Sequence, residues 1–131
     1  MTFILPETGK DQGHPLFVTV HEIKNNQGSI RVAIYDSAKT FMKTIWKGKK
    51  THAKVGAVEV SFENVVPGTY AIGVFHDAND NGKFDSNLLG IPKEGFGFSN
   101  DAMGTFGPPS FHEAKFDWDG QKTISIKLKY F

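Results

Sequence analysis

The residues from Asp77 to Asp85 have the composition and spacing of a calcium-binding loop. They read Asp-Ala-Asn-Asp-Asn-Gly-Lys-Phe-Asp, which places Asp77, Asn79 and Asn81 at the first, third and fifth positions. Calcium takes about six to eight oxygen ligands, and a short loop supplies them from alternate positions around a sharply turning glycine. Gly82 occupies that glycine position. The spacing therefore predicts a Ca²⁺ site in this loop.

The remaining ligands would come from the second half of the loop and from outside it. Lys83 would contribute its backbone carbonyl and Asp85 its carboxylate, and further oxygens would come from Asn87, Glu94, Asp101 or Asp36. Leu88 stands where an EF-hand has its closing glutamate, so the loop is not an EF-hand. The alternative interpretation is a run of turns in which Asp and Asn side chains bond their own backbone.

The elements that must position this loop are β-strands. Apolar residues alternate with other residues in five segments, as half-buried strands require, and these are 16–21, 30–35, 58–62, 70–77 and 124–130. Asn25-Asn26-Gln27-Gly28 has the composition of a tight turn, which predicts that the first two segments form one hairpin. Short alternating strands separated by turns are typical of a β-sandwich or barrel.

The length of 131 residues fits a single domain. We expect residues 1–15 to form an N-terminal extension and residues 16–131 to form the β domain. Residues 36–54 are polar and are expected to be irregular, with the lysines from Lys43 to Lys50 on a solvated loop. Residues 77–116 would be a long ordered loop whose many phenylalanines pack it onto the sheet, because unorganised loops of that length are uncommon.

The composition excludes several classes of function. Lys and Arg number 15 against 14 Asp and Glu, a balance that argues against nucleic-acid binding. No apolar run approaches the roughly 18 residues of a transmembrane helix. Cysteine is absent, so disulfides are too. No secretory leader is visible, which leaves either a cytoplasmic chain or a mature exported form. The five histidines lack metal-ligand spacing and there is no nucleophile elbow, so we expect no enzyme.

Three longer patterns resemble a known family. They are His76-Asp77-x-Asn79-x-Asn81-Gly82-x-x-Asp85, the segment 90–100, and Gly107-Pro108-Pro109-Ser110-Phe111. Together with Phe62-x-x-Val65-x-Pro67-Gly68-x-Tyr70, they resemble the bacterial "domain of unknown function 2141" family over residues 18–130. The resemblance implies an immunoglobulin-like or transthyretin-like antiparallel sandwich of about seven strands. It also implies an exported protein, extracellular or periplasmic, whose leader has been removed.

Three hypotheses of function follow. The first is a calcium-stabilised structural subunit of an extracellular filament, a homo-oligomer in which Phe3, Ile4 and Leu5 donate a strand to the next copy. The second is a soluble calcium-stabilised module that binds a glycan or a protein through Phe96, Phe98 and Phe106. The third is a hydrolase-type enzyme, which requires His76, Asp77, Glu94 and His112 to converge in one cleft. The first is the hypothesis we prefer from the sequence.

Overall fold

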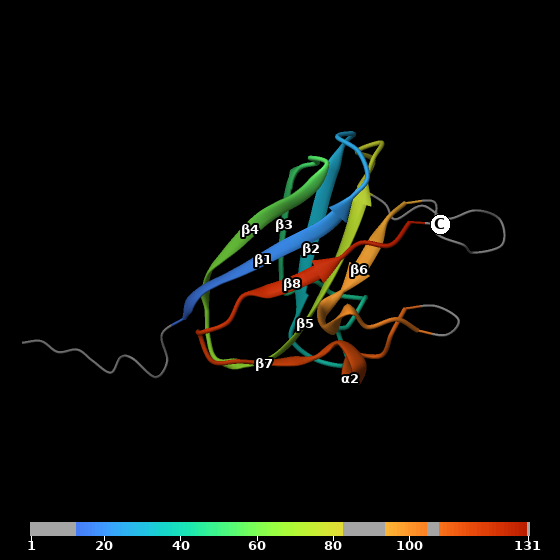
Figure 1. Cartoon of the computed structure of the whole chain (residues 1–131). Coiled ribbons are helices and arrows are strands. Elements are labelled where there is room, and N and C mark those ends of the chain that lie inside the picture. The colour runs from blue at the N-terminus through green and yellow to red at the C-terminus, as the bar shows by residue number, and fades with distance from the viewer. Residues whose placement is uncertain (1–12, 83–93, 105–107, 131) are drawn as a thin grey trace, which may run out of the picture.

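The computed structural model of the chain describes residues 13–82, 94–104 and 108–130. Two sheets face each other across a common core (Figure 1). The smaller sheet has the strand order β4-β1-β8, and its strands are β1 (His14–Ile23), β4 (Gly56–Val65) and β8 (Ile124–Lys127). The prediction of an all-β sandwich is therefore confirmed, and the arrangement is compatible with a transthyretin-like fold.

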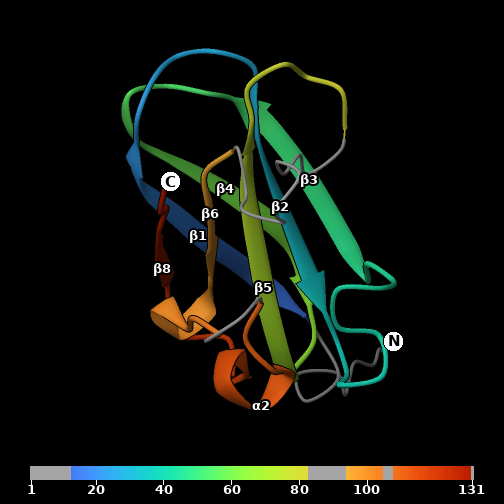
Figure 2. The same ribbon diagram turned by 90° about the vertical axis from the view of Figure 1, so that its right-hand side faces the viewer.

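The larger sheet has the strand order β3-β2-β5-β6, and Figure 2 looks onto its outer face. Its strands are β2 (Ser29–Tyr35), β3 (Lys47–His52), β5 (Gly68–Asp77) and β6 (Phe96–Phe98), and β7 (Phe116–Trp118) pairs with the beginning of β5. The helical elements are a 3₁₀ turn, η1 (Ser99–Asp101), and α2 (Phe111–Ala114). One strand pair departs from the expected antiparallel arrangement, because β1 and β8 run parallel.

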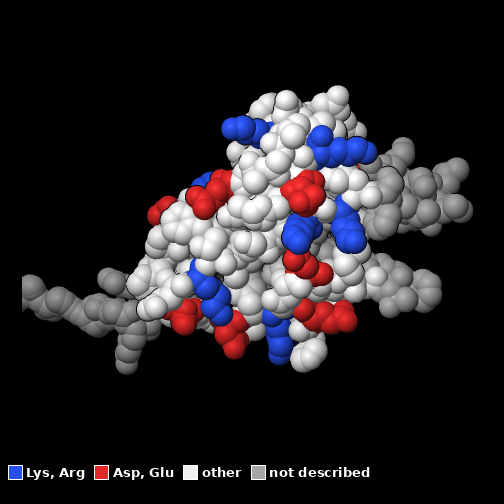
Figure 3. Space-filling model, in the orientation of Figure 1, with Lys and Arg blue, Asp and Glu red and all other residues white. Residues whose placement is uncertain are grey.

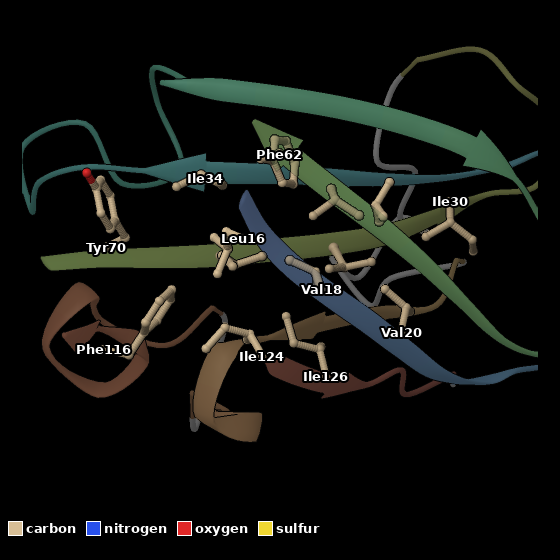
Figure 4. Packing of buried hydrophobic residues seen from close by; sticks show 14 of the residues in the cluster. Leu16, Val18, Val20, Ile30, Ile34, Phe62, Tyr70, Phe116, Ile124 and Ile126 are labelled. Atoms are coloured by element: carbon tan, nitrogen blue, oxygen red, sulfur yellow. The ribbon is translucent and has the colours of Figure 1, made fainter. Parts of the chain in front are cut away.

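The core lies between the sheets and is built by the alternation seen in the sequence. Leu16, Val18 and Val20 of β1 are fully buried and face Ile30 and Ile34 of β2 across the interior (Figure 4). Successive side chains of a strand point to opposite faces, so each strand contributes every second residue to this core. The burial of large aliphatic side chains is the main stabilising contribution to such a sandwich.

The predicted hairpin between the first two strands is wrong. β1 pairs with β4 and β8, whereas β2 pairs with β3 and β5 in the opposite sheet. The segment 25–28 therefore crosses from one sheet to the other. Two strands that face each other across a core show the same alternation as two strands of a hairpin, which is why the sequence pattern did not separate the two cases.

Residues 36–54 contain a strand that the polar sequence concealed. β3 pairs with β2 along its whole length, with Lys49 opposite Val32. Lys47 and Lys49 are not free on a solvated loop, because their Nζ groups donate to the backbone carbonyls of Glu63 (3.2 Å) and Ser61 (2.6 Å) on β4. An edge strand is held by backbone hydrogen bonds and can do without apolar side chains.

The long segment after β5 is organised by short elements along one edge of that strand. β6 and β7 pair with different parts of β5, and the Ser99 side chain bridges the interval between them. Its Oγ accepts from the Ile72 amide (2.9 Å) and donates to the Ala114 carbonyl (2.5 Å). Ser110 and Glu113 form a capping box that begins α2. Their spacing in the sequence is the signal that predicts this helix start.

Candidate functional site

The Asp77 side chain anchors the loop that follows β5. It is fully buried, and its Oδ2 accepts from Arg31 Nε and from the Gly82 amide, both at 2.8 Å. Its Oδ1 accepts from the Asn81 amide at 3.2 Å. A buried carboxylate needs such partners, because an unpaired charge in the interior is strongly unfavourable. The first residue of the predicted calcium loop is thus already neutralised by a guanidinium group.

These contacts determine the charge state of Asp77. Burial by itself would raise the pKa of this carboxyl group. The hydrogen bonds from Arg31, Gly82 and Asn81, together with the charge of Arg31, outweigh burial and hold the pKa below its ordinary value of 3.8. Asp77 is therefore an anion at neutral pH and stabilises the folded state in that form.

The rest of the described loop is organised by local hydrogen bonds. The Asn81 amide also donates to Asn79 Oδ1 (3.3 Å), the Asp80 amide donates to the Asp77 carbonyl (3.1 Å), and Ser29 Oγ donates to Asp80 Oδ1 (2.6 Å). This is the pattern of Asx-type turns, the alternative interpretation of the spacing. The loop geometry between 77 and 82 is therefore accounted for by the protein's own groups.

Several of the predicted calcium ligands lie outside the described residues, namely Lys83, Asp85 and Asn87. Of the others, Asp36 accepts from Thr40 and Asp101 accepts from the Lys127 amide, so both have other partners. Glu94 is buried. Within residues 13–82, 94–104 and 108–130, no three His, Asp or Glu side chains are grouped to hold a metal. The calcium site stays a prediction that rests on the spacing.

His76 is buried beside Asp77 but faces the opposite way. Its Nε2 lies 2.6 Å from the Gln27 carbonyl, which only accepts, so Nε2 carries a proton. In the neutral ring, Nδ1 then accepts from the Tyr130 hydroxyl at 2.7 Å. Burial raises the pKa of Tyr130, against the opposing effect of a hydrogen bond from the Lys24 amide, so this phenol keeps its proton.

The convergence required for a hydrolase is not found. His76 is 1% exposed and lies near the end of β5, with both ring nitrogens engaged. His112 is exposed on α2, which packs near the beginning of β5 (Figure 1). Ser110 and Glu113, the other polar residues near His112, bond each other in the capping box. His76, Ser110 and Glu113 thus have structural partners, and His112 lies near the opposite end of β5 from His76.

The segment expected to donate a strand, Phe3, Ile4 and Leu5, lies outside the described residues, so strand donation stays a prediction. β1 begins at His14, inside the segment expected to precede the domain. The edges that could accept a strand are partly occupied, because Lys47 and Lys49 bond carbonyls of β4 and Asp101 bonds the Lys127 amide of β8. In the described part of the chain, nothing pairs with the outer side of β3.

The outer face of the larger sheet holds a feature that the sequence analysis missed. Gly48, Ala33 and Gly73 are register partners on the neighbouring strands β3, β2 and β5, so they form a row of small residues across the sheet. Phe98 of β6 ends this row. Small side chains make a shallow floor where larger neighbours stand higher on both sides. The row is invisible in the sequence, because only the strand register brings these residues together.

Larger side chains surround this floor and produce a hollow of about 490 Å³. We call it the outer-face hollow. Its prominent apolar lining residues are Tyr35, Met42, Ile45, Phe75, Phe96 and Phe98, and its basic ones are Arg31, Lys49 and Lys50. Phe96 and Phe98 are buried, which supports the expectation that the phenylalanines of this segment pack onto the sheet and not the alternative of an exposed contact surface. Phe106 lies outside the described residues.

Comparison with family models identifies the family of this chain. The model of a family described as "uncharacterized protein conserved in bacteria (DUF2141)" matches residues 18–126. The chain belongs to this family. The resemblance drawn from the loop and glycine motifs is thereby confirmed. Comparisons with curated proteins and with solved structures gave no match.

Two surface properties of this DUF2141 protein bear on its partners. The face shown in Figure 3 carries Lys and Arg side chains interspersed with Asp and Glu, so positive charge does not gather there into a stripe. Nucleic-acid binders concentrate positive charge on one face. Across the described ranges, the helices are too short or too polar to cross a bilayer.

The calcium prediction for this DUF2141 protein can be tested by thermal unfolding. At about 10 mM Ca²⁺ and a dissociation constant of about 10⁻⁴–10⁻³ M, binding to the folded state raises the melting temperature by about 5–10 °C. Asp85→Asn replaces one predicted carboxylate ligand with a neutral amide and is expected to reduce this rise. Asp119→Asn, at an exposed acid outside the loop, is the matched control and is expected to preserve it. A melting temperature indifferent to calcium and to chelator would rule the site out.

Proposed function

We propose that this DUF2141 protein is a non-enzymatic binding module that holds a small ligand with an apolar body in the outer-face hollow. The observation that carries the proposal is the hollow itself. A volume of about 490 Å³ with a mainly apolar lining falls in the size range of small-molecule sites, roughly 300–1,000 Å³. Export from the cell and stabilisation by calcium remain parts of the proposal that rest on the family resemblance and on the loop spacing.

The two outer faces of the sandwich differ, and the difference favours a role for the larger sheet. On β1 and β8 of the smaller sheet, Thr19 and His21 face outward opposite Ser125 and Lys127, and Phe17, 39% exposed, is the large apolar side chain of β1 on that face. On the larger sheet, Met42 and Ile45 line the hollow while remaining 43% and 55% exposed. Large apolar side chains that stay exposed around a concave surface are a mark of binding sites.

The backbone at Met42 adds a second argument. This residue has a φ of 64°, in the left-handed region that non-glycine residues seldom adopt. Such a conformation costs on the order of 1 kcal/mol and tends to occur where function needs it. A glycine or an asparagine would relieve the strain but would remove an apolar side chain from the rim of the hollow.

Binding in the hollow is preferred here to the filament hypothesis. Strand donation needs an acceptor edge, and the backbone of β4 and β8 is already bonded in part by Lys47 and Lys49 of β3 and by Asp101. The outer side of β3 is unpaired among the described residues, but this strand carries Lys47, Lys49 and Lys50. Lysines on edge strands are a known means of preventing strand addition. The ligand-binding proposal needs no such edge and draws on a hollow that is already formed.

A neutral apolar fluorophore tests the proposal. N-phenyl-1-naphthylamine, whose emission rises in apolar surroundings, is expected to bind with a dissociation constant of about 1–100 μM. Gly73→Val is expected to weaken binding about tenfold or more, because its two methyl groups occupy the floor of the hollow. A Cβ at Gly73 meets Phe98 at 3.4 Å and Tyr35 at 3.6 Å, which are ordinary contact distances, and the melting temperature of the variant reports whether the two γ-methyl groups are accommodated as well.

Two further variants make the fluorophore test specific. Met42→Asn keeps a residue that tolerates positive φ and removes the thioether, so it is expected to weaken binding without lowering the melting temperature. Thr19→Val adds an apolar group to the outer face of the smaller sheet and is expected to bind as the wild type does. If Gly73→Val and Met42→Asn bind the fluorophore with unchanged affinity, the outer-face hollow is not the binding site and the proposal fails.

A further inference from the structure

One end of the outer-face hollow places two positive charges directly opposite each other. Arg31 of β2 and Lys50 of β3 are register partners and both line the hollow. Like charges in directly opposed positions on neighbouring strands destabilise a sheet. The described lining of the hollow includes basic side chains and no acidic one. A chain whose net charge is only +1 thus concentrates positive charge at this place.

Asp77 is the acidic group beside this pair, and it engages only part of the Arg31 side chain. Asp77 lies on one side of Arg31 and bonds its Nε, while its other contacts are with the Asn81 and Gly82 amides. The terminal Nη groups of Arg31 are not used in that ion pair. Among the described residues, the Lys50 side chain makes neither an ion pair nor a hydrogen bond, and it is exposed.

The third basic lining residue has a different role. Lys49 is the register partner of Val32, a core residue, and its Nζ reaches the Ser61 carbonyl on β4 at 2.6 Å. Lys50 and Arg31, by contrast, share the outer face with the small-residue row of Gly48, Ala33 and Gly73. The charged end and the apolar floor of the hollow are therefore adjacent rows of one sheet face.

We infer that the ligand of the hollow is an amphiphilic carboxylate, with its apolar body on the floor around Gly73 and its head group at Arg31 and Lys50. This inference rests on the proposed binding function and adds the chemical class of the ligand. A guanidinium fork matches the geometry of a carboxylate, and an ammonium group adds a second charge at the same end. Free fatty acids and related carboxylates combine such an apolar body with a carboxylate head group.

A dansylated undecanoic acid and its methyl ester share the apolar chain and differ in the charge of the head group, so comparing them tests the contribution of the carboxylate. The acid is expected to bind about five- to tenfold more tightly than the ester, which corresponds to about 1 kcal/mol for a partly exposed ion pair. Raising the NaCl concentration is expected to weaken binding of the acid and to leave the ester unaffected, because salt screens charges near the surface.

Lys50→Gln tests the position of the head group. This variant is expected to reduce the advantage of the acid over the ester by about threefold or more, with the affinity for the ester unchanged. Lys122→Gln, which neutralises an exposed lysine in the loop before β8, is the matched control and is expected to retain the full difference. Gly73→Val is expected to weaken both probes.

The outcomes distinguish the inference from the function on which it rests. Equal affinity for the acid and the ester would overturn the carboxylate assignment. An advantage of the acid that is undiminished in Lys50→Gln would overturn the placement of the head group at Lys50. Either result leaves the binding module standing. Failure of both probes to bind would overturn the inference together with the binding function. Tighter binding of the acid that is reduced about threefold or more in Lys50→Gln and weakened by salt supports the assignment.

Discussion

Gly28→Ala is expected to lower the free energy of unfolding by about 3–5 kcal/mol, a large part of the stability of a domain of this size. A Cβ at Gly28 would lie 2.0 Å from the Asp77 carbonyl oxygen and 2.6 Å from that of Ala78. Both are backbone atoms at the point where β5 ends and the Asp77 loop begins. Neither can move without displacing the buried Asp77 side chain, and chemical denaturation at neutral pH measures the loss.

Gly56→Ala is the control that measures the cost of the backbone conformation without the close approach found at Gly28. Gly56 has a φ of 98° and Gly28 one of 67°, so an alanine is conformationally unfavourable at both positions. A Cβ at Gly56 meets nothing within 4 Å. Gly56→Ala is therefore expected to cost about 1–2 kcal/mol, from the left-handed conformation alone. Equal losses in the two variants would contradict the role assigned to the close approach at Gly28.

The sequence predicted the residues of the core better than the pairing of the strands. Leu16, Val18 and Val20 are buried as their alternation requires, because alternation reports only which face of a strand is apolar. It does not report which strand lies next to it. That choice depends on contacts between distant segments, such as Val18 opposite both Val60 and Ile124. The hairpin error has this origin.

For the candidate site, too, the sequence predicts residues that are neighbours in the chain but not contacts between strands. The polar loop from Asp77 could be recognised from the sequence, because its residues are neighbours in the chain. The main partner of Asp77 could not be recognised in this way. Arg31 is a register partner of Phe75 in the next strand and reaches Asp77 from there. The floor of the outer-face hollow likewise joins Gly48, Ala33 and Gly73, which are unremarkable until register aligns them.

Asp77→Asn is expected to lower the free energy of unfolding by about 2–3 kcal/mol at neutral pH. The general cost of breaking a buried ion pair is about 3–5 kcal/mol, and it is reduced here because the Arg31 side chain is 31% exposed. An amide has one accepting oxygen, and its NH₂ group would confront donors at Arg31 or at the Gly82 amide. Chemical denaturation of both proteins at neutral pH measures the difference.

The pH dependence identifies the ionised carboxylate as the cause. The folded-state pKa of Asp77 lies below 3.8, so the unfolded chain binds more protons at this group as the pH falls. The stabilisation is therefore complete above about pH 4–5 and is lost as the pH falls through the folded-state pKa. Wild type and Asp77→Asn are expected to differ most at neutral pH and to converge in stability at low pH, where Asp77 is protonated and resembles the amide.

Asp117→Asn supplies the matched control for the loss of a carboxylate. Asp117 is exposed and accepts from Thr69 Oγ1 at 3.0 Å, without a buried cationic partner. This variant is expected to change the free energy of unfolding by about 0.5 kcal/mol or less. If Asp77→Asn keeps its full deficit at low pH, the ion pair with Arg31 is not what holds the loop. In that case the Asn81 and Gly82 amides, which bind the oxygens in either protonation state, account for the anchoring.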